Sequence, residues 1–262
     1  MKQSSSSVVV SSSSVESVAE IKPNGYYKSN CPEGKKCNYV STDYLNQKFL
    51  LDNKYGEIRD DRDGKIYKTI KIGEQIWMAQ NLNYTTNKSW CFENESSNCD
   101  KYGRLYTWAG AIDSLRLYRL AEIHCGYNRT CSFLSETKWR GVCPLGWHLP
   151  TKAEFDTLVI KVLWRSSALK SNTSWIDENG NDCSGDDSFG FSAMPAGWRF
   201  YLNNAFDQLG QQAYIWSVSE YEYPYNKNSA YHLFLSAVND EVAVGNTTKS
   251  DASSVRCIKD SE

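Results

Sequence analysis

A row of tyrosines is the part of the sequence best suited to contact a ligand. It lies in the segment EYEYPYNKNS, where Tyr221, Tyr223 and Tyr225 recur at every second position and therefore share one face of an extended chain. Glu220 and Asn226 flank the row with a carboxylate and an amide. Flat rings with a hydroxyl at the tip, beside such groups, suit sugar stacking and adaptable protein recognition. The alternative is that the rings only cover the domain's own surface and have no role in binding.

Two acidic segments raise the question of a bound cation, because hard cations such as calcium prefer clustered carboxylates. The first contains Asp60, Asp61 and Asp63, but it lacks the ligand spacing and the closing glutamate of an EF-hand, which favours a plain acidic turn. The second is the long polar loop 174–190, which also lacks a spaced ligand pattern. A solvated insertion rich in turn formers is the favoured interpretation. Its four carboxylates are those of Asp177, Asp182, Asp186 and Asp187. We therefore expect no metal and no cofactor.

The histidines do not lie in a catalytic motif. His124, His148 and His232 have no G-x-S-x-G or H-E-x-x-H pattern around them, and the chain has no glycine-rich phosphate loop. Each histidine is expected to be packed or at the surface. We therefore expect no catalytic residues and no enzymatic activity.

The cysteines indicate an oxidising compartment. The chain has 9 of them, and three of the gaps are short loops, a spacing typical of local disulfides. The alternatives are reduced thiols in a cytosolic protein and, with less support from the spacing, a zinc site. We expect a secreted or cell-surface protein, although the N-terminal residues lack the apolar segment of a secretory signal. The expected pairs are Cys31 with Cys37, Cys91 with Cys99, Cys125 with Cys131, and Cys143 with Cys257, leaving Cys183 unpaired.

Length and charge narrow the class of partner. With 262 residues the chain can bury a substantial core, and its net charge of −2 comes without a long basic run. Nucleic acid is therefore not an expected partner. No stretch approaches the roughly 20 apolar residues of a membrane helix, so we expect membrane contact only through a tether. We expect three parts: a Ser-rich flexible linker in 1–22, a small disulfide-stapled lead-in that docks on the main domain in 23–54, and the main domain in 55–262.

The patterning of the main domain predicts an α+β fold. A helix should begin at Thr151, because Thr151 and Glu154 form a capping box and an apolar stripe follows as Phe155, Leu158, Val159, Val162 and Leu163. Helical spacing also relates Leu105, Trp108, Ala109 and Ile112. Alternation around Gly73 predicts a β-hairpin, and the runs after residue 188 predict antiparallel strands separated by short turns.

Six sequence segments occur in the same order as in a known family. They are DGKIYKTIKIGEQIWMAQNLNY (63–84), YGRLYTWAGA (102–111), RGVCPLGWHLPTKAEF (140–155), GFSAMPAGWR (190–199), IWSVSEY (215–221) and SVRCIKD (254–260). Through these segments the chain resembles the Fibrobacter succinogenes major paralogous domain over roughly residues 55–260. That family is similar to the C-type lectin-like and sulfatase-modifying-factor folds, and its members are similar to secreted or surface proteins.

The resemblance implies where a ligand binds. In C-type lectin-like proteins the long-loop face carries the ligand, which adds Trp198, Arg199 and Trp216 to the tyrosine segment. The calcium-dependent sugar motifs Glu-Pro-Asn and Trp-Asn-Asp are missing, with only a partial echo at Val238-Asn239-Asp240. Formylglycine-generating enzymes need a pair of cysteines near the C-terminus, whereas this chain has only Cys257 there.

These inferences favour a binding module that recognises a polysaccharide or a surface protein without turning it over. Two alternatives stay open. One is a structural or assembly component that self-associates, and the other is an enzyme on the formylglycine-generating-enzyme scaffold.

Overall fold

The computed structural model describes residues 38–221 and 226–261 of the chain. The chain divides into two units, Met1–Lys35 and Lys36–Glu262, and the described residues belong to the second. Residues 38–54 of the expected lead-in are therefore built into the same unit as the main domain. The Ser-rich segment 1–22 and the expected Cys31–Cys37 bridge lie outside the described residues.

One of the two sheets has six strands, in the order β1-β3-β4-β14-β7, with β2 paired to the side of β3. All pairings are antiparallel except the parallel pair of β1 and β3. Gly73 joins β3 to β4 with a φ of 61°, which confirms the predicted hairpin. The strands are β1 (Asn38–Tyr39), β2 (Gly56–Arg59), β3 (Lys65–Ile72), β4 (Gln75–Met78), β7 (Trp147–His148) and β14 (Ile258–Lys259).

The other sheet has eight strands, in the order β12-β11-β10-β8-β13-β6-β5, with β9 paired to β8. It is mostly antiparallel, but β10 runs parallel to both β8 and β13. The strands are β5 (Ser89–Trp90), β6 (Leu105–Thr107), β8 (Ala196–Arg199), β9 (Phe206–Leu209), β10 (Gln212–Glu220), β11 (Ser229–Ser236), β12 (Ala243–Thr248) and β13 (Ala252–Ser254).

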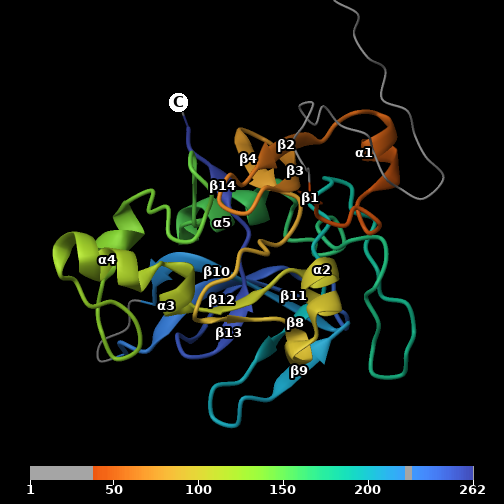
Figure 1. Cartoon of the computed structure of the whole chain (residues 1–262). Helices are drawn as coiled ribbons and strands as arrows, with labels where there is room; N and C mark the ends of the chain where they lie inside the picture. The colour runs from red at the N-terminus through yellow and green to blue at the C-terminus, as the bar shows by residue number, and fades with distance from the viewer. Residues whose placement is uncertain (1–37, 222–225, 262) are drawn as a thin grey trace, which may run out of the picture. The chain divides into compact units, whose positions relative to one another are not determined.

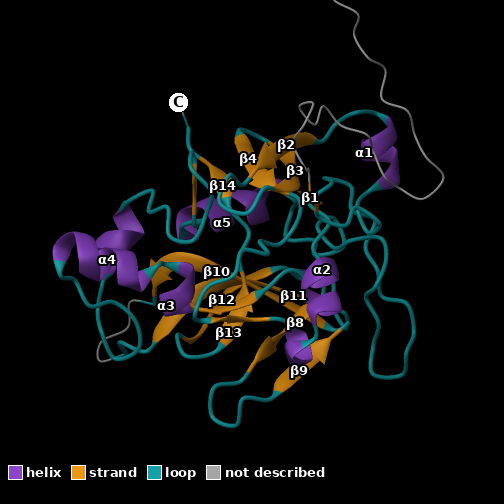
Figure 2. Cartoon of the chain, viewed as in Figure 1, coloured by secondary structure: helices purple, strands orange, loops and turns teal. Residues whose placement is uncertain are grey.

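Short helices lie between and beside the sheets (Figure 2). They are α1 (Gln47–Leu51), α2 (Ser96–Tyr102), α3 (Trp108–Ala111), α4 (Ser114–Ala121), α5 (Lys152–Lys161) and the 3₁₀ turns η1 (Phe92–Asn94) and η2 (Ser132–Glu136). The α+β class is therefore confirmed, with more helices than the two that the sequence predicts. In residues 38–221 and 226–261, no helix is both long enough and apolar enough for a membrane crossing.

Helix α5 begins as the sequence predicts. The Thr151 hydroxyl accepts a hydrogen bond from the Glu154 amide, and the Glu154 carboxylate accepts one from the Thr151 amide at 2.8 Å, which completes the capping box. Phe155, Leu158 and Val159 are fully buried. The expected last member of the stripe, Leu163, is instead 77% exposed. The helix ends at Lys161, and a left-handed backbone at Leu163 turns its side chain outward.

The helical spacing around Trp108 is realised only in part. Leu105 belongs to strand β6, where it pairs with Trp90 and Ser254, and the helix begins at Trp108. Thr107 marks the change, since its hydroxyl accepts a hydrogen bond from the Gly110 amide at 3.2 Å. The same spacing of apolar residues arises when a strand leads directly into a helix and both elements bury the same side of the chain.

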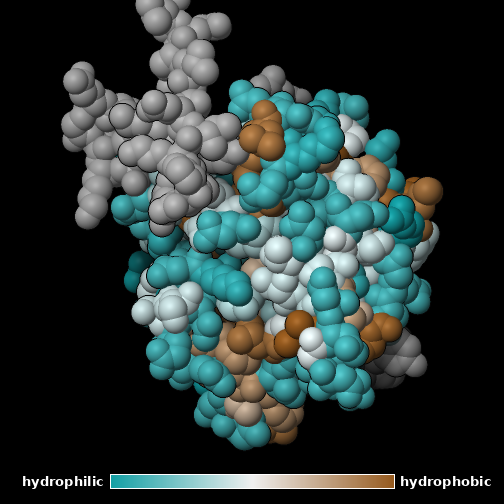
Figure 3. All heavy atoms as spheres, turned by 90° about the vertical axis from the view of Figure 1, so that its right-hand side faces the viewer, coloured by the Kyte–Doolittle hydropathy of each residue, from teal (hydrophilic) through white to brown (hydrophobic). Residues whose placement is uncertain are grey.

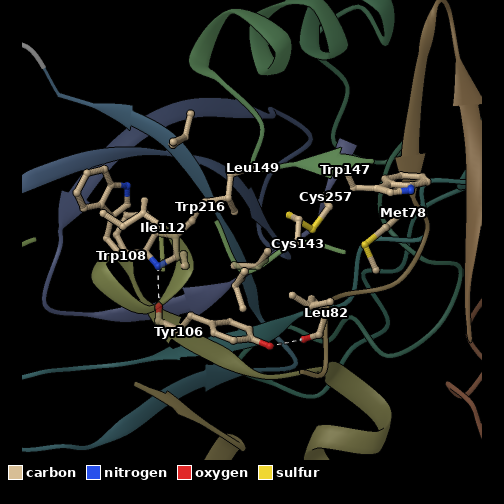
Figure 4. Close-up of a cluster of buried hydrophobic side chains, with 14 of the residues drawn as sticks. Met78, Leu82, Tyr106, Trp108, Ile112, Cys143, Trp147, Leu149, Trp216 and Cys257 are labelled. Atoms are coloured by element: carbon tan, nitrogen blue, oxygen red, sulfur yellow. Dashed lines mark hydrogen bonds between the residues drawn. A yellow bond between two sulfur atoms is a disulfide. The ribbon is translucent and has the colours of Figure 1, made fainter. Parts of the chain in front are cut away.

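The core beneath α3 joins the two sheets (Figure 4). Trp108, Tyr106 and Trp216 are fully buried there beside the Cys143–Cys257 disulfide. This bridge spans 114 residues and links the segment before β7 to the segment before β14. The Cys91–Cys99 and Cys125–Cys131 bridges are also present, and Cys183 is free. These three predicted pairs are confirmed.

Candidate functional site: an aromatic strip on the eight-stranded sheet

Trp216 lies in the core rather than on an exposed face. Its side chain is 0% exposed, and its indole nitrogen donates a hydrogen bond to the Tyr106 carbonyl at 2.7 Å (Figure 4). The face of β10 at this point is covered by α3 and η2. The structure therefore removes Trp216 from the set of residues that can contact a ligand.

Glu220 also has a structural role. Its carboxylate is buried, pairs with the ammonium of Lys249 and accepts a hydrogen bond from the Cys131 amide at 2.7 Å. Lys249 is itself completely buried and donates to the carbonyls of Arg129 and Lys227 at 2.9 and 2.8 Å. Glu220 and Lys249 thus fasten three loops to the end of β10, and neither is available to a ligand.

The tyrosine row falls at the edge of the described residues. Tyr221 is half-buried, and its ring lies 5.4 Å from that of Tyr231. Tyr223 and Tyr225 lie outside the described residues. Asn226 accepts a hydrogen bond from the Asn228 amide at 3.0 Å and donates one to Ser229 at 3.1 Å, so it shapes the turn into β11.

Trp198 and Arg199 lie elsewhere on the sheet. They belong to β8, whose Gly197 pairs with Ala213 near the start of β10, whereas Tyr221 follows the end of β10. At about 3.3 Å per residue, Tyr214 and Tyr221 are roughly 20 Å apart along the strand. The residues that the sequence predicts for one ligand face therefore divide between two regions.

Arg199 is largely engaged within the domain. Its guanidinium lies 4.1 Å from the centre of the Trp90 ring and donates a hydrogen bond to Asn204. Partial burial lowers its pKa below the usual value. Arg199 therefore braces the β8–β9 hairpin on the side of Trp90, with part of its side chain left at the surface.

Around Trp198 the structure assembles an aromatic strip that the sequence alone does not reveal. We define the strip as Trp198, Phe200, Tyr201, Tyr214 and Phe234. The Trp198 ring lies 5.4 Å from Phe200 and 6.0 Å from Tyr214, and Tyr214 lies 4.9 Å from Phe234. All five side chains are partly exposed or exposed. Tyr201 joins the strip through Phe200, whose ring lies 5.5 Å away. Rings from β8 and the two residues after it, from β10 and from β11 thus form a continuous aromatic surface open to solvent.

Strand register brings the strip together. Tyr214 pairs directly with Phe234, and two pairs further along Trp216 faces His232. Alternation places Tyr214 and Trp216 on the same face of β10. The helical layer covers Trp216 but leaves Tyr214 open, so one sheet face passes from core to surface within two residues. The signal for this strip was the repeated aromatic alternation in β10 and β11, but the pairing register is not readable from it.

Two ring nitrogens at the strip have no hydrogen-bond partner in the described part of the chain. They are Nε1 of Trp198 and Nδ1 of His232, both shielded from solvent. The His232 ring lies 5.0 Å from that of Tyr214, and burial lowers its pKa to about 4, so it is neutral at pH 7. A buried polar atom without a partner costs about 1–3 kcal/mol. Because both nitrogens are shielded from solvent, they belong to the packing beneath the strip and not to its exposed surface.

Three of the four carboxylates of the acidic loop lie at the surface, and one is buried. Asp177 accepts hydrogen bonds from the amides of Asn179 and Asn181, and Asp186 pairs with Arg165. Asp187 departs from the expected solvated insertion, because it is fully buried and accepts two hydrogen bonds from Ser192. The remaining carboxylate, that of Asp182, accepts from the Ser184 amide. Burial raises the pKa of Asp187 to about 7. Within residues 38–221 and 226–261, no three His, Cys, Asp or Glu side chains are grouped as a metal site.

His148 is held between two carboxylates. Its Nε2 lies 2.9 Å from Glu154 and its Nδ1 lies 2.6 Å from Asp260. Burial lowers the pKa of His148, but hydrogen bonds and charge from the two carboxylates outweigh it and the pKa is raised. This arrangement joins the N-terminus of α5 to the segment after β14. It agrees with the expectation of a packed histidine.

Comparison with known proteins identifies a family for most of the main domain. Residues 70–259 match the model of a family described as the Fibrobacter succinogenes major domain. No curated protein and no solved structure shows significant similarity to the chain. The matched segment contains α5, the Cys143–Cys257 bridge and all five residues of the aromatic strip.

Proposed function

The chain belongs to the Fibrobacter succinogenes major domain family, and we propose that it is a non-catalytic binding module that recognises a polysaccharide through the aromatic strip. The strip replaces the tyrosine row as the centre of the proposed site. Trp198 is retained from the residues that the resemblance implied, and Tyr214 and Phe234 are added.

The observation that carries this proposal is the run of partly exposed rings around Trp198, each within about 6 Å of the next. The C–H face of a pyranose packs against flat aromatic rings of this kind. A row of such rings therefore favours a sugar chain laid along the strip.

The disulfides support a secreted or cell-surface location. Three bridges are present in the described residues, and structural disulfides persist in oxidising compartments. We propose a C-type lectin-like fold, in which two sheets and short helices carry ligand-binding loops. The Ser-rich residues 1–22 would then act as a linker to an anchor or a further module.

The proposal that the chain is not an enzyme rests on the bonding of its cysteines. Cys257, the cysteine expected near the C-terminus, is bonded to Cys143 and buried, so its sulfur is not a free thiolate ligand. A copper titration combined with a thiol count tests this directly. Copper bound in proportion to protein, with loss of free thiol, would instead favour an oxidase on the formylglycine-generating-enzyme scaffold.

A glycan array with the oxidised protein tests the proposed function. Trp198→Ala and Tyr214→Ala should each reduce binding by about tenfold or more, since stacking of a sugar-sized ring is worth about 1–3 kcal/mol. Tyr118→Ala is the matched control, because Tyr118 is an exposed ring on α4 outside the strip. Equal binding by the parent and both strip variants would refute the strip as the site.

A second candidate function is supported by a separate apolar surface. Ile160, Leu163, Trp164 and Val238 are each more than half exposed, and the segment after α5 is joined to the β11–β12 loop by a hydrogen bond from the Val242 amide to the Trp164 carbonyl. Exposed apolar groups of this kind mark protein contacts. The mass in solution tests self-association. A monomeric mass at high concentration would remove the assembly role between identical chains.

A further inference from the structure

A second concave site lies away from the aromatic strip. Three segments that are distant in sequence, the loop 41–44, helix α2 and the loop 173–174, line a cavity of about 500 Å³ that is open to solvent. This volume is within the range of small-molecule sites and is large enough for a sugar residue. The side of the molecule that carries α1, α2 and the acidic loop is mostly hydrophilic (Figure 3).

The lining of this cavity is unusually rich in hydroxyls. Ser41, Ser97, Thr173 and Ser174 contribute hydroxyl groups, and Asp43 and Asp100 contribute carboxylates. Tyr44 adds a phenol, whose burial raises its pKa to about 12 and keeps it protonated. Hydroxyls donate and accept hydrogen bonds, whereas carboxylates accept them. The cavity therefore matches a ligand that itself carries several hydroxyl groups.

The two carboxylates have no side-chain partner among residues 38–221 and 226–261. In the part of the chain that the structure describes, the side chains of Asp43 and Asp100 make no hydrogen bond or ion pair. Lys101 also lines the cavity, and its ammonium lies 4.9 Å from the centre of the Tyr102 ring. Two carboxylates and one ammonium leave the cavity with a net negative charge. A neutral or amine-bearing ligand suits this charge, and an acidic one does not.

Buried amides hold the walls of the cavity in place. Gln80 is fully buried and donates to the carbonyls of Val40 and Ser41 at 3.2 and 2.6 Å. Its neighbour Asn81 donates to the carbonyl of Tyr102 at 2.9 Å, at the end of α2. Two consecutive residues of the core thus fix two separate walls.

The remaining walls are anchored in the same way. The Cys91–Cys99 disulfide fastens α2. The loop 173–174 is held by the hydroxyl of Ser171, which donates to the Thr173 carbonyl at 2.7 Å, and by the fully buried Trp175 that follows. A cavity formed from segments that are each tied to the core is preorganised, which lowers the entropic cost of binding.

We propose that this cavity is a second binding site, which takes a single neutral or amine-bearing sugar residue. The inference rests on the proposed function in taking sugars as the ligand class. It adds a site that binds one sugar unit, such as the end or a branch of a polysaccharide, whereas the aromatic strip binds several sugar units along the polysaccharide.

Saturation-transfer NMR with three methyl glycosides tests the site. The probes are methyl glucoside, methyl glucosaminide and methyl glucuronide, which have the same ring and differ in charge. A ligand of this size binds at concentrations on the order of millimolar. The glucoside and the glucosaminide should show saturation, and the glucuronide should bind about tenfold more weakly because of the net negative charge.

Variants assign the signal to the cavity. The exposed Asp43 and Asp100 allow a double change, Asp43→Asn with Asp100→Asn, without disturbing the core. It should abolish the preference against the glucuronide, and Thr173→Val should weaken all three probes. Trp198→Ala should leave the three signals unchanged, since Trp198 does not line the cavity.

The two proposals fail separately. Equal binding of the glucuronide and the glucoside, an unchanged order in the double variant, or no saturation of any probe would overturn the cavity site. Loss of the probe signals in Trp198→Ala would also overturn it, because the sugars would then bind at the strip. None of these outcomes would contradict polysaccharide binding that depends on Trp198, so the proposed function is tested separately.

Discussion

Removing the carboxylate of Glu220 should destabilise the fold more than any change at an exposed ion pair. The side chains of Glu220 and Lys249 are 6% and 0% exposed, so solvent does not screen their interaction. In Glu220→Ala the Lys249 ammonium would keep two carbonyl partners and the Trp108 ring at 4.6 Å, but no anion. Breaking one side of a buried pair costs about 3–5 kcal/mol. The melting temperature should fall by about 10 °C for a chain of this size.

Urea unfolding followed by tryptophan fluorescence, with the disulfides oxidised, measures this effect. Asp52→Asn is the control, because the Lys48–Asp52 pair is exposed and should contribute less than about 0.5 kcal/mol. Replacing both partners, as in Glu220→Gln with Lys249→Met, should recover much of the loss, since neither new side chain carries a charge and the glutamine carbonyl can still accept the hydrogen bond from the Cys131 amide. A loss below about 1 kcal/mol in Glu220→Ala would refute the assignment of this pair as a structural anchor.

The charge on Lys249 also predicts how the variant responds to pH. In the parent, burial lowers the pKa of Lys249 while the hydrogen bond and charge of Glu220 oppose this shift. Without Glu220 the pKa should fall further, so the unfolded state binds more protons than the folded one at alkaline pH. The free energy of unfolding of Glu220→Ala should therefore rise relative to that of the parent as the pH is raised from neutral toward the ordinary lysine pKa. A difference in unfolding free energy between the two proteins that stays constant across this range would contradict the argument.

Three further changes test other parts of the fold. The pKa of His148 is raised from 6.5 in the folded protein, so its contribution to stability is present below pH 6.5 and is lost as the pH rises. The pKa of Glu154 is lowered from 4.5, so its contribution to stability is present above pH 4.5 and is lost as the pH falls. The urea midpoint should therefore have a maximum between these two pH values, and His148→Gln should remove it. Gly141→Ala should prevent folding or reduce the melting temperature sharply, since φ is 52° and a Cβ would collide with a backbone carbonyl, whereas Gly180→Ala, in open space, should cost only about 1 kcal/mol. Opening the Cys143–Cys257 bridge with paired serines should lower the free energy of unfolding by about 4–5 kcal/mol, and a loss no greater than that for the Cys91–Cys99 bridge would contradict the chain-entropy account.

Features determined by neighbouring residues were readable from the sequence. The capping box at Thr151, the hairpin at Gly73 and the two short disulfides depend on side chains and turns only a few residues apart. The left-handed turn that exposes Leu163 was not readable, because the apolar stripe continues beyond the point where the helix ends.

The site depended on contacts that alternation does not determine. Alternation shows that Tyr214 and Trp216 share a face, but which of the two is covered depends on where α3 and η2 pack. The partner of Tyr214 on β11 depends on strand register, and the bulge between Trp216 and Glu220 shifts that register within a single strand. The role of Glu220 was not readable for the same reason, because its partner Lys249 is distant in the sequence and no neighbouring residue indicates the pairing.

The position of the last two strands has a consequence for the timing of folding. β13 lies between β8 and β6 in one sheet, and β14 lies between β4 and β7 in the other, so neither sheet can close before residues 252–259 have been synthesised. Pairing over such separations is slow because the intervening chain must first lose its freedom. Both sheets therefore stay incomplete until residues 252–259 have been synthesised, and the closure of the two sheets is coupled to the arrival of that one segment.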